Sequence, residues 1–272
     1  MRTEGPARLR RPPRQAGFTL LELVVVLVIL GLLAAAGGRA VGRALEQTRF
    51  EETQRRLLAI RSALVGDPEV RGPEGRSDFG YTGDVGELPA SLERLLTRGD
   101  DPAWAIRAEA ISGLTRPAGW HGPYLPPAFH EDPAGRLRDG WGEPIRLVRD
   151  GPSIRLVSAG SDGRGGTAGD LSLDLTPEVR GTLAGLLLDG RGRPRAGSVL
   201  LVIARRGLPA RLEAGAGADG RFVFTGVPIG RHPLAAPGRD GLIVREIVVH
   251  PRRVTHVTLE PPGEPAVTGM VP

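Results

Sequence analysis

The segment from Phe18 to Gly38 is apolar throughout and contains a single charged residue, Glu22. A helix of this length extends roughly 30 Å, which matches the hydrocarbon core of a lipid bilayer. A buried helix in a soluble protein is rarely so long and so uniformly apolar. We therefore predict a membrane-spanning helix, with the residues before it in the cytoplasm and the residues after Gly38 outside.

The formal net charge of +5 comes mainly from the residues that precede this segment. The basic residues there are Arg2, Arg8, Arg10, Arg11 and Arg14, and they face only Glu4. The remainder of the chain is close to neutral, so its charge gives no support for binding nucleic acid. The chain has no cysteine, which excludes disulfides and cysteine-ligated metals.

A secretory signal peptide is an alternative interpretation of the basic and apolar N-terminal region. Such a peptide has a shorter apolar core, followed by small residues at the cleavage site. The residues from Ala34 to Ala36 could serve as that site. The alternative predicts cleavage after Ala36, whereas a membrane-spanning helix would be retained in the mature protein.

The sequence Gly17-Phe18-Thr19-Leu20-Leu21-Glu22, between a basic leader and an apolar helix, resembles the processing site of type IV pilins and type II secretion pseudopilins. In that family a membrane peptidase cuts after the glycine and the new N-terminal residue is methylated. The resemblance implies cleavage between Gly17 and Phe18, methylation of the Phe18 amine, and an assembly role for Glu22. Residues 1–17 would then be a cleaved leader.

An ionised carboxylate at membrane depth is costly unless it has a partner. Cleavage would create an amine at Phe18, and Glu22 of one subunit can meet the Phe18 amine of its neighbour in a filament. The pair would set the register of assembly more than add stability. The alternative is an incidental glutamate near the lipid–water interface.

Beyond the membrane we expect the helix to continue to Val65, where Gly66-Asp67-Pro68 stops it, so that residues 18–66 form a transmembrane and stem helix. A head at 67–178 should contain one short helix and a β-hairpin. The expected elements are a helix at Leu88–Leu96 with Ser91 as a cap, and strands at Pro144–Val148 and Ser153–Ser158. The stretches GWHGPYLPP, from Gly119, and RDGWGEPIRLV, from Arg138, resemble corresponding segments of the type II secretion major pseudopilin.

The loop SAGSDGRGGTAGDL, from Ser158 to Leu171, formally contains a dinucleotide fingerprint. That chemistry needs a helix directly after the glycines, whereas an alternating, strand-like piece follows here. In major pseudopilins the equivalent loop binds calcium. Transferred by position, the resemblance implies ligands from four residues: the carboxylates of Asp162 and Asp170, the Ala159 carbonyl and an oxygen of Thr167. Gly169 stands where some members carry a further acid, and a metal-free glycine turn is the alternative.

Residues 179–261 form a separate stretch of β-branched or leucine-rich runs divided by Gly, Pro and Asp turns, which predicts an all-β sandwich. The expected strands are Leu183–Leu188, Ser198–Ala204, Arg221–Thr225, Leu242–His250 and Val254–Leu259, with Phe222 and Phe224 on one buried face. GLLLDGRGRPRAGSVLLV, from Gly185, and ADGRFVFTGVPIGRHPL, from Ala218, resemble the carboxypeptidase regulatory-like domain, which implies no peptidase activity. Residues 262–272 would be a flexible tail.

These patterns predict an α+β chain with a long N-terminal helix, a small antiparallel-sheet pilin head and a β-sandwich. No catalytic motif appears. The five histidines lack the spacing of metal ligands, and the G-x-S-x-G motif that carries the serine nucleophile of many hydrolases is absent. We therefore predict a structural subunit and not an enzyme.

The expected function is that of a type II secretion pseudopilus subunit, held in the bacterial inner membrane by a single pass with its bulk in the periplasm. The resemblance implies four kinds of partner: further copies of itself, a prepilin peptidase and methyltransferase, an inner-membrane assembly platform, and minor pseudopilins. Polymerisation would drive protein export across the outer membrane. The alternatives are a surface type IV pilus or minor pilin subunit, and a membrane-anchored periplasmic binding module.

Overall fold

The computed structural model describes residues 17, 19–73, 75–129, 132, 137–239 and 241–261, and for residues 33–40 it describes the helical backbone only. The chain divides into two compact units, Met1–Thr48 and Arg49–Pro272. The predicted leader before Gly17, residue Phe18 and the predicted tail at 262–272 lie outside the described residues.

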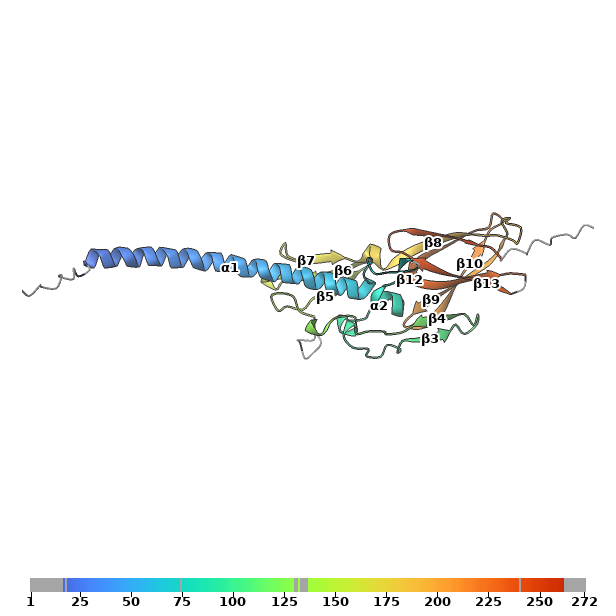
Figure 1. Cartoon of the computed structure of the whole chain (residues 1–272), viewed down its shortest axis with the longest axis horizontal. Coiled ribbons are helices and arrows are strands. Elements are labelled where there is room, and N and C mark those ends of the chain that lie inside the picture. The colour runs from blue at the N-terminus through green and yellow to red at the C-terminus, as the bar shows by residue number, and fades with distance from the viewer. Residues whose placement is uncertain are drawn as a thin grey trace, which may run out of the picture. The chain divides into compact units, whose positions relative to one another are not determined.

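Helix α1 runs from Leu20 to Val65, so it begins in the first unit and ends in the second (Figure 1). In the first unit, the large apolar side chains from Leu20 to Leu32 are all exposed. Within the part of the chain that the structure describes, no helix combines the length and the apolar character needed to cross a membrane. The membrane-spanning segment therefore stays a prediction.

The end of α1 is fixed by Gly66, as the sequence predicts. The Gly66 amide donates a hydrogen bond to Ser62 O at 2.7 Å, and Gly66 has a positive φ of 79°. A Cβ on Gly66 would lie 2.4 Å from the Asp78 carbonyl oxygen, so only glycine fits. The Asp78 carboxylate accepts a hydrogen bond from the Asp67 amide, which holds the chain in its new direction.

The elements that follow α1 in the head region, residues 67–178, are short. Two sheets here are hairpins, β1-β2 and β3-β4, and the third has the order β5-β6-β7 with antiparallel pairing. The elements are β1 Arg71–Gly72, β2 Gly75–Arg76, α2 Gly80–Val85, η1 Leu92–Leu95, β3 Ala105–Ala108, β4 Thr115–Ala118, η2 Pro127–Phe129, β5 Arg146–Asp150, β6 Ser153–Ser158, η3 Gly160–Asp162, β7 Leu171–Asp174 and η4 Thr176–Glu178.

The last turns of α1 form the centre of the hydrophobic core of the head. Ile60 and Leu64 have no exposed surface, and they belong to one cluster with Leu95, Leu156 and Leu175. An ion pair lies beside this buried face, since Glu52 Oε1 is 2.7 Å from Arg56 Nε. Exposed polar residues, among them Glu51 and Arg55, lie on the rest of the surface, as expected for an amphipathic stem.

Two further sheets follow in the C-terminal region, residues 179–261. One has the order β10-β9-β12-β13, and the other has the order β11-β8-β14 with β14 parallel to β8. Leucine, valine and phenylalanine side chains from both sheets share one buried cluster. The strands are β8 Arg180–Leu187, β9 Gly197–Arg205, β10 Leu208–Ala216, β11 Arg221–Pro228, β12 Gly230–Pro237, β13 Leu242–Val249 and β14 Val254–Leu259.

The C-terminal region confirms the five expected strands, with shifted ends, and adds two that the sequence did not predict. Phe222 and Phe224 are buried on one face of β11, as predicted. The additional strands are β10, which pairs with β9 along its whole length, and β12, which lies between β9 and β13. Strand β12 contains Pro233, which cannot donate a ladder hydrogen bond and therefore hid the strand in the sequence.

Two expectations for the head need correction. The helix expected at Leu88–Leu96 is only the 3₁₀ turn η1, and the Ser91 side chain makes no capping hydrogen bond. Pro89 and the tight turn around it leave too few residues for a full α-helical segment. The expected hairpin is confirmed, although its first strand begins at Arg146 and its Asp150 pairs with Ser153.

Buried polar contacts join the head region to the C-terminal region. Glu178 accepts two hydrogen bonds from Arg61 of α1, at 2.6 and 3.0 Å, and one from Arg252 at 2.9 Å. Arg116 Nη1 of β4 lies 2.9 Å from His232 Nδ1 of β12, and His232 Nε2 lies 2.8 Å from Pro228 O. Because broken pairs of this kind leave a buried charge unsatisfied, these contacts hold the two regions in one arrangement.

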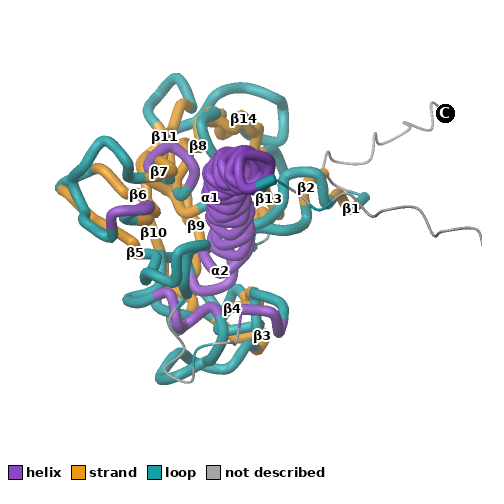
Figure 2. The backbone as a smooth tube through the Cα atoms, turned by 90° about the vertical axis from the view of Figure 1, so that its left-hand side faces the viewer, coloured by secondary structure: helices purple, strands orange, loops and turns teal. Residues whose placement is uncertain are grey.

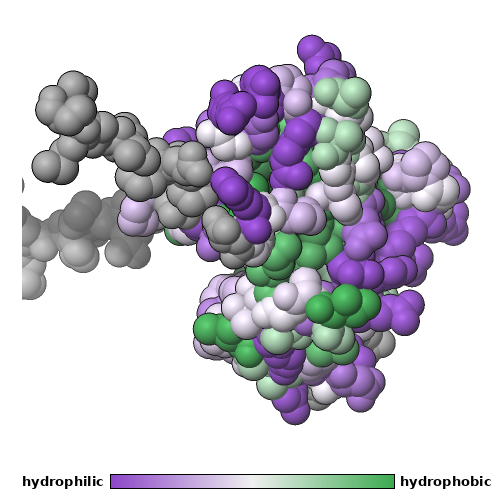
Figure 3. Space-filling model, turned by 90° about the vertical axis from the view of Figure 1, so that its right-hand side faces the viewer, coloured by the Kyte–Doolittle hydropathy of each residue, from purple (hydrophilic) through white to green (hydrophobic). Residues whose placement is uncertain are grey.

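The second unit has its small hairpin β3-β4 on the side away from β8 of the three-stranded sheet (Figures 1 and 2). Figure 3 shows one face of the molecule, where hydrophilic side chains predominate and hydrophobic ones form small groups. Such a mixed face is ordinary for a folded domain in water. The α+β class is confirmed, and the β-sandwich stays a prediction.

Candidate functional site

The N-terminal candidate site begins with Gly17, which is exposed, and continues into the first turn of α1. The Glu22 amide donates a hydrogen bond to Thr19 Oγ1 at 3.2 Å. Thr19 therefore caps the helix, and the spacing from Thr19 to Glu22 is that of a capping box. This spacing was visible in the sequence, but it was not used to predict the start of the helix.

The contact with Thr19 leaves the Glu22 carboxylate available for another interaction. Only the Glu22 backbone amide takes part in the contact with Thr19, and the Glu22 residue is exposed. Its carboxylate lies in the first helical turn, where a negative charge is favourable because backbone amide groups there lack helical partners. The position suits an interaction with a positive group outside the helix.

The second candidate site, the loop from Ser158 to Leu171, joins β6 to β7. Gly160 has a φ of 64°, and a Cβ on it would lie 2.2 Å from the Gly169 carbonyl oxygen. The two ends of the loop are therefore in direct contact, and glycine is required at this point. Strand β7 follows directly, and no helix begins after the glycines, so the dinucleotide interpretation remains rejected.

The structure brings three of the four expected ligand residues together. The Thr167 hydroxyl donates to Asp170 Oδ1 at 3.2 Å, and Asp170 Oδ2 accepts a hydrogen bond from the Gly166 amide at 2.7 Å. Thr167 also lies near enough to Asp162 to lower the pKa of that carboxyl. The fold of the loop thus brings Thr167 and Asp170 into direct contact, with Asp162 close by.

The pKa of the Asp162 carboxyl lies below its usual range, mainly because the Arg164 amide donates a hydrogen bond to it at 3.0 Å. The Thr167 hydroxyl and the Arg164 guanidinium act in the same direction. Asp162 is therefore ionised at neutral pH and able to attract a cation. The fourth expected ligand residue, Ala159, directly precedes η3.

Glu143 is a further acid near this loop, and the sequence analysis did not select it. A Cβ on Gly163 would lie 3.8 Å from Glu143 Oε1, so the Glu143 side chain reaches the outer part of the loop. Glu143 belongs to the turn before β5, far from the loop in sequence. Only the three-dimensional fold brings the two segments together.

Asp139 explains why the turn containing Glu143 has a fixed position. Its carboxylate accepts hydrogen bonds from the Trp141 and Glu143 amides, both at 2.9 Å, and from the Ser158 hydroxyl at 2.6 Å. Ser158 in turn accepts a hydrogen bond from the Gly160 amide at the start of the loop. One buried carboxylate therefore orients the turn and the loop together.

The same turn is attached to the stem helix. The Gly140 amide donates to Thr53 Oγ1 at 2.9 Å, and a Cβ on Gly140 would lie 2.2 Å from the Arg49 carbonyl oxygen. This close approach gives a physical reason for the glycine in the RDGWGEP segment. The loop is thus connected, through Ser158, Asp139 and Gly140, to the part of α1 in the second unit.

The donors in this loop can be compared with what a calcium ion requires. Calcium prefers six to eight oxygen ligands, including carboxylates, and it tolerates flexible geometry. Asp162, Thr167 and Asp170 supply oxygens of the right kind, but they include only two carboxylates. Among the described residues, no three Asp, Glu, His or Cys side chains are grouped closely enough to hold a metal. The side chains therefore supply only part of the oxygens that a calcium ion would need, and the rest would have to come from backbone and water.

Comparison with known protein families gives a match for the N-terminal motif. A family model described as the prokaryotic N-terminal methylation motif matches residues 12–38. This range includes Gly17, Phe18 and Glu22, the residues selected from the sequence. The match covers the basic and apolar segment only.

A second similarity extends over much more of the chain. The type II secretion system core protein G of Xanthomonas campestris pv. campestris is 30% identical over 162 residues, which are 58% of this chain and 87% of that protein. Almost the whole relative is therefore matched, whereas a large part of this chain has no counterpart in the match. The extent agrees with a pseudopilin to which a further region is attached.

Solved structures give only distant similarities. The major pilin subunit of Bacillus cereus is 12% identical, with 42% of this chain and 39% of that chain covered and a TM-score of 0.25. The 5-hydroxyisourate hydrolase of Klebsiella pneumoniae is 23% identical, with 30% of this chain and 87% of that chain covered and a TM-score of 0.21. Scores this low carry no argument about fold or function.

The expectation of a pseudopilin, made from the N-terminal motif and two segments of the head, is confirmed by the similarity to core protein G. The methylation motif and the match to core protein G agree with each other, because both describe the same kind of subunit. This chain therefore belongs to the family of the type II secretion system core protein G, the pseudopilins, whose members are structural subunits and not enzymes.

Proposed function

We propose that this pseudopilin is cleaved between Gly17 and Phe18, methylated at Phe18, and assembled with further copies of itself into a pseudopilus that drives protein export across the outer membrane. Its partners would be the prepilin peptidase and methyltransferase, the inner-membrane assembly platform and minor pseudopilins. The observation that carries the proposal is the methylation motif at residues 12–38, within which a helix begins that continues to Val65.

Before assembly, the subunit would be held in the inner membrane by the apolar start of α1, with its second unit in the periplasm. The apolar side chains from Leu20 to Leu32 are exposed and have no core of their own to enter. Lipid before assembly, and neighbouring helices after it, would remove this surface from water. Exposed leucine and valine at this density are otherwise an aggregation hazard.

In the filament, the Glu22 carboxylate would pair with the methylated Phe18 amine of a neighbouring subunit. The exposed position of Glu22 in the first turn of α1 supports this role. Both charges would be in a low-dielectric environment, where an unpaired charge is costly and a wrongly registered neighbour is rejected. The pair would therefore select the register of assembly.

Intact-mass spectrometry of the membrane-extracted protein tests the processing step. We expect a mature chain that begins at Phe18 and carries one added methyl group. Gly17→Leu should block cleavage, whereas Gly31→Leu, in the middle of the apolar helix with open space around its Cβ position, should be processed normally. A mature chain that begins at Met1, or after Ala36, would contradict the proposal. The first result would favour a plain membrane anchor, and the second a secreted protein.

For the loop from Ser158 to Leu171, we propose weak calcium binding by Asp162, Thr167, Asp170 and the Ala159 carbonyl. The close approach of Gly160 to Gly169, the hydrogen bond from Thr167 to Asp170 and the lowered pKa of Asp162 support this set of residues. A bound calcium ion would supply positive charge and fix the loop against β6 and β7.

The C-terminal region, residues 179–261, would form a carboxypeptidase regulatory-like β-sandwich that each subunit displays on the pseudopilus. The shared buried cluster of its two sheets supports a sandwich, and the Glu178 contacts support a fixed position relative to the head. A surface pilus or minor pilin subunit remains the alternative within the same class. The test is to measure export of secreted proteins in cells whose gene lacks residues 179–272. Continued export would assign secretion to the remaining pseudopilin and display to the C-terminal region.

A further inference from the structure

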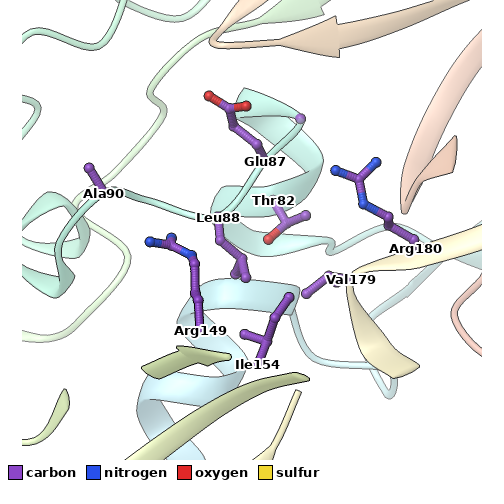
Figure 4. A pocket seen from close by; sticks show the side chains of 9 residues that line it. Thr82, Glu87, Leu88, Ala90, Arg149, Ile154, Val179 and Arg180 are labelled. Carbon is purple, nitrogen blue, oxygen red and sulfur yellow. The ribbon is translucent and has the colours of Figure 1, made fainter. Parts of the chain in front are cut away.

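A recess of about 360 Å³ lies between the head region and the start of the C-terminal region (Figure 4). Its walls come from α2 and the segment after it, from β5 and β6, and from the start of β8. The volume is within the range of pockets that hold small ligands. Its lining includes Thr82, Glu87, Leu88, Arg149, Ile154 and Arg180.

Thr82 supplies the first indication that the recess accepts a ligand. The residue is only 1% exposed, and its hydroxyl is buried without a hydrogen-bond partner in the described structure. A threonine inside a helix commonly donates to a carbonyl one turn earlier, and Thr82 does not. Leaving a buried hydroxyl unsatisfied costs stability, so its presence beside a recess calls for a polar group that enters from outside.

The charges around the recess indicate what kind of polar group it is. Arg149 and Arg180 are exposed and lie on opposite sides of Thr82 (Figure 4). Each donates to one backbone carbonyl, of Pro89 and Gly226 respectively, and a guanidinium has five N–H donors. The carboxylate of Glu87 lies 3.6 Å from Arg206, which offsets its charge. The rim is therefore positive overall and suits an anion.

The floor of the recess is apolar. The side chains of Leu88 and Ile154 project into it near Thr82 (Figure 4), and Val179 also lines it. A purely inorganic anion would leave this surface in contact with water. A ligand that carries an anionic group beside an apolar group would satisfy the rim, the floor and the Thr82 hydroxyl at the same time.

We propose that this recess binds a carboxylate that lies next to an apolar group. The carboxylate would accept hydrogen bonds from the Arg149 or Arg180 guanidinium, the apolar group would contact Leu88 and Ile154, and a neighbouring carbonyl would accept the Thr82 hydroxyl. Such a carboxylate comes either from a small organic acid or from the C-terminus of a peptide. The proposal does not depend on how the pseudopilus assembles.

The test is isothermal titration calorimetry on the full chain in detergent micelles, with N-acetyl-L-leucine as the small acid and a pentapeptide that ends in leucine as the peptide. The corresponding amides, which lack the carboxylate, are the matched probes. We expect saturable binding of the acids and at least about tenfold weaker binding of the amides. Tighter binding of the pentapeptide than of N-acetyl-L-leucine identifies a peptide terminus as the source, and equal binding identifies a small acid.

Variants locate the binding to the recess. Arg149→Met and Arg180→Met remove one guanidinium each, and at least one of them should weaken binding by about tenfold. Arg155→Met is the matched control, because Arg155 follows Ile154 on β6, is exposed and does not line the recess. Binding that is equal in all three variants, or no saturable heat with either acid, would overturn the proposal.

Thr82→Val separates a ligand-binding role from a structural one. Valine has nearly the same shape as threonine without the hydroxyl, so it removes the unsatisfied group from the folded protein. We expect an unchanged or higher melting temperature together with weaker binding of N-acetyl-L-leucine. A lower melting temperature with unchanged binding would show that the hydroxyl serves the fold, and it would contradict the proposal.

Discussion

The two ends of helix α1 contain the same kinds of apolar side chain in opposite environments. In the first unit, Leu20, Leu27 and Leu32 are 80%, 59% and 67% exposed. In the second unit, Ile60 and Leu64 are fully buried. The difference does not come from residue type, since both segments are rich in aliphatic residues. It comes from whether the rest of the chain supplies a partner surface.

This difference separates two uses of apolar surface in one helix. Around Ile60 and Leu64, burial stabilises the fold, by roughly 1.5–3 kcal/mol for each fully buried side chain. From Leu20 to Leu32, the side chains contribute nothing to the core of the head. They are available to lipid and to neighbouring subunits, which is what a subunit that moves from a membrane into a filament requires.

The largest expected effect concerns the end of α1 that has no internal partner. Glu22→Gln should reduce filament yield by about tenfold or more, because it leaves the Phe18 amine of the neighbouring subunit without its counter-charge. Membrane insertion should be unchanged, since glutamine is less costly in lipid than an ionised carboxylate. The measurement is the amount of sheared or cross-linked filament relative to the amount of subunit in the membrane.

Two controls keep this prediction specific. Thr19→Val removes the hydroxyl that caps the helix but leaves the Glu22 carboxylate, so its effect on filament yield should be small. Glu69→Gln removes an exposed acid from the head and should have no effect. If Thr19→Val reduced assembly as strongly as Glu22→Gln, Glu22 would act through the start of the helix and not through a charge pair.

The second effect compares the two ends of the helix directly. Ile60→Ala should lower the free energy of unfolding of the second unit by about 2–5 kcal/mol, because it leaves a cavity in the core. Leu27→Ala should change it by less than about 0.5 kcal/mol, since Leu27 is exposed. Denaturant unfolding of both variants in detergent measures the difference. Similar losses in the two would mean that the N-terminal part of α1 also packs against the fold.

The third effect concerns the buried pair that joins the head to the C-terminal region. Burial, assisted by the nearby Arg116 guanidinium, lowers the pKa of His232 from 6.5 to about 3. His232 therefore binds a proton below about pH 6.5 in the unfolded chain, but only below about pH 3 in the folded chain. The contribution of His232 to stability is complete above pH 6.5 and is lost as the pH falls toward 3.

Between pH 6.5 and pH 5 this linkage should lower the free energy of unfolding by about 2 kcal/mol. His232→Gln should remove this part of the pH dependence, whereas His256→Gln, at an exposed histidine, should retain it. Unfolding midpoints measured at the two pH values give the comparison. A pH dependence that is identical in wild type and His232→Gln would show that other groups cause it.

The smallest effect concerns the loop from Ser158 to Leu171, the proposed calcium site, which lies on the surface of the second unit. Calcium should raise the melting temperature by about 2–4 °C when it is in large excess, because it binds only the folded loop. Asp162→Ala should abolish the rise. Asp219→Ala, at an exposed aspartate in a turn of the C-terminal region, should retain it. An equal rise in all three proteins would place the ion elsewhere, and no rise would mean that glycine turns alone hold the loop.

Sequence patterns within single segments predicted most of the local features of the fold. The helix that ends at Val65, the β-hairpin of the head and the buried Phe222–Phe224 face are all confirmed, because periodicity and turn residues are local signals. Strand β12 was missed, because Pro233 and the small residues after it give no strand pattern. Its neighbours β9 and β13 stabilise it in the sheet, which is a tertiary effect.

The candidate sites differ in the same way: one is a continuous segment, and the others combine distant segments. The motif from Gly17 to Glu22 could be recognised in the sequence because its residues are contiguous in the chain. The position of Glu143 beside the loop of Asp162 could not, since it depends on how the turn held by Asp139 packs against α1. The recess at Thr82 is likewise formed by four separate segments.

The sequence by itself therefore determined the long helix, its apolar start, the processing motif and the family, because each depends on residues that are close together in the chain. Only the tertiary structure decided which apolar residues of α1 are buried, how Glu178 and His232 join the two regions, and where Thr82 is left without a partner. The physical reason is that burial and hydrogen bonding depend on surfaces brought together from distant parts of the chain, and no local pattern records them.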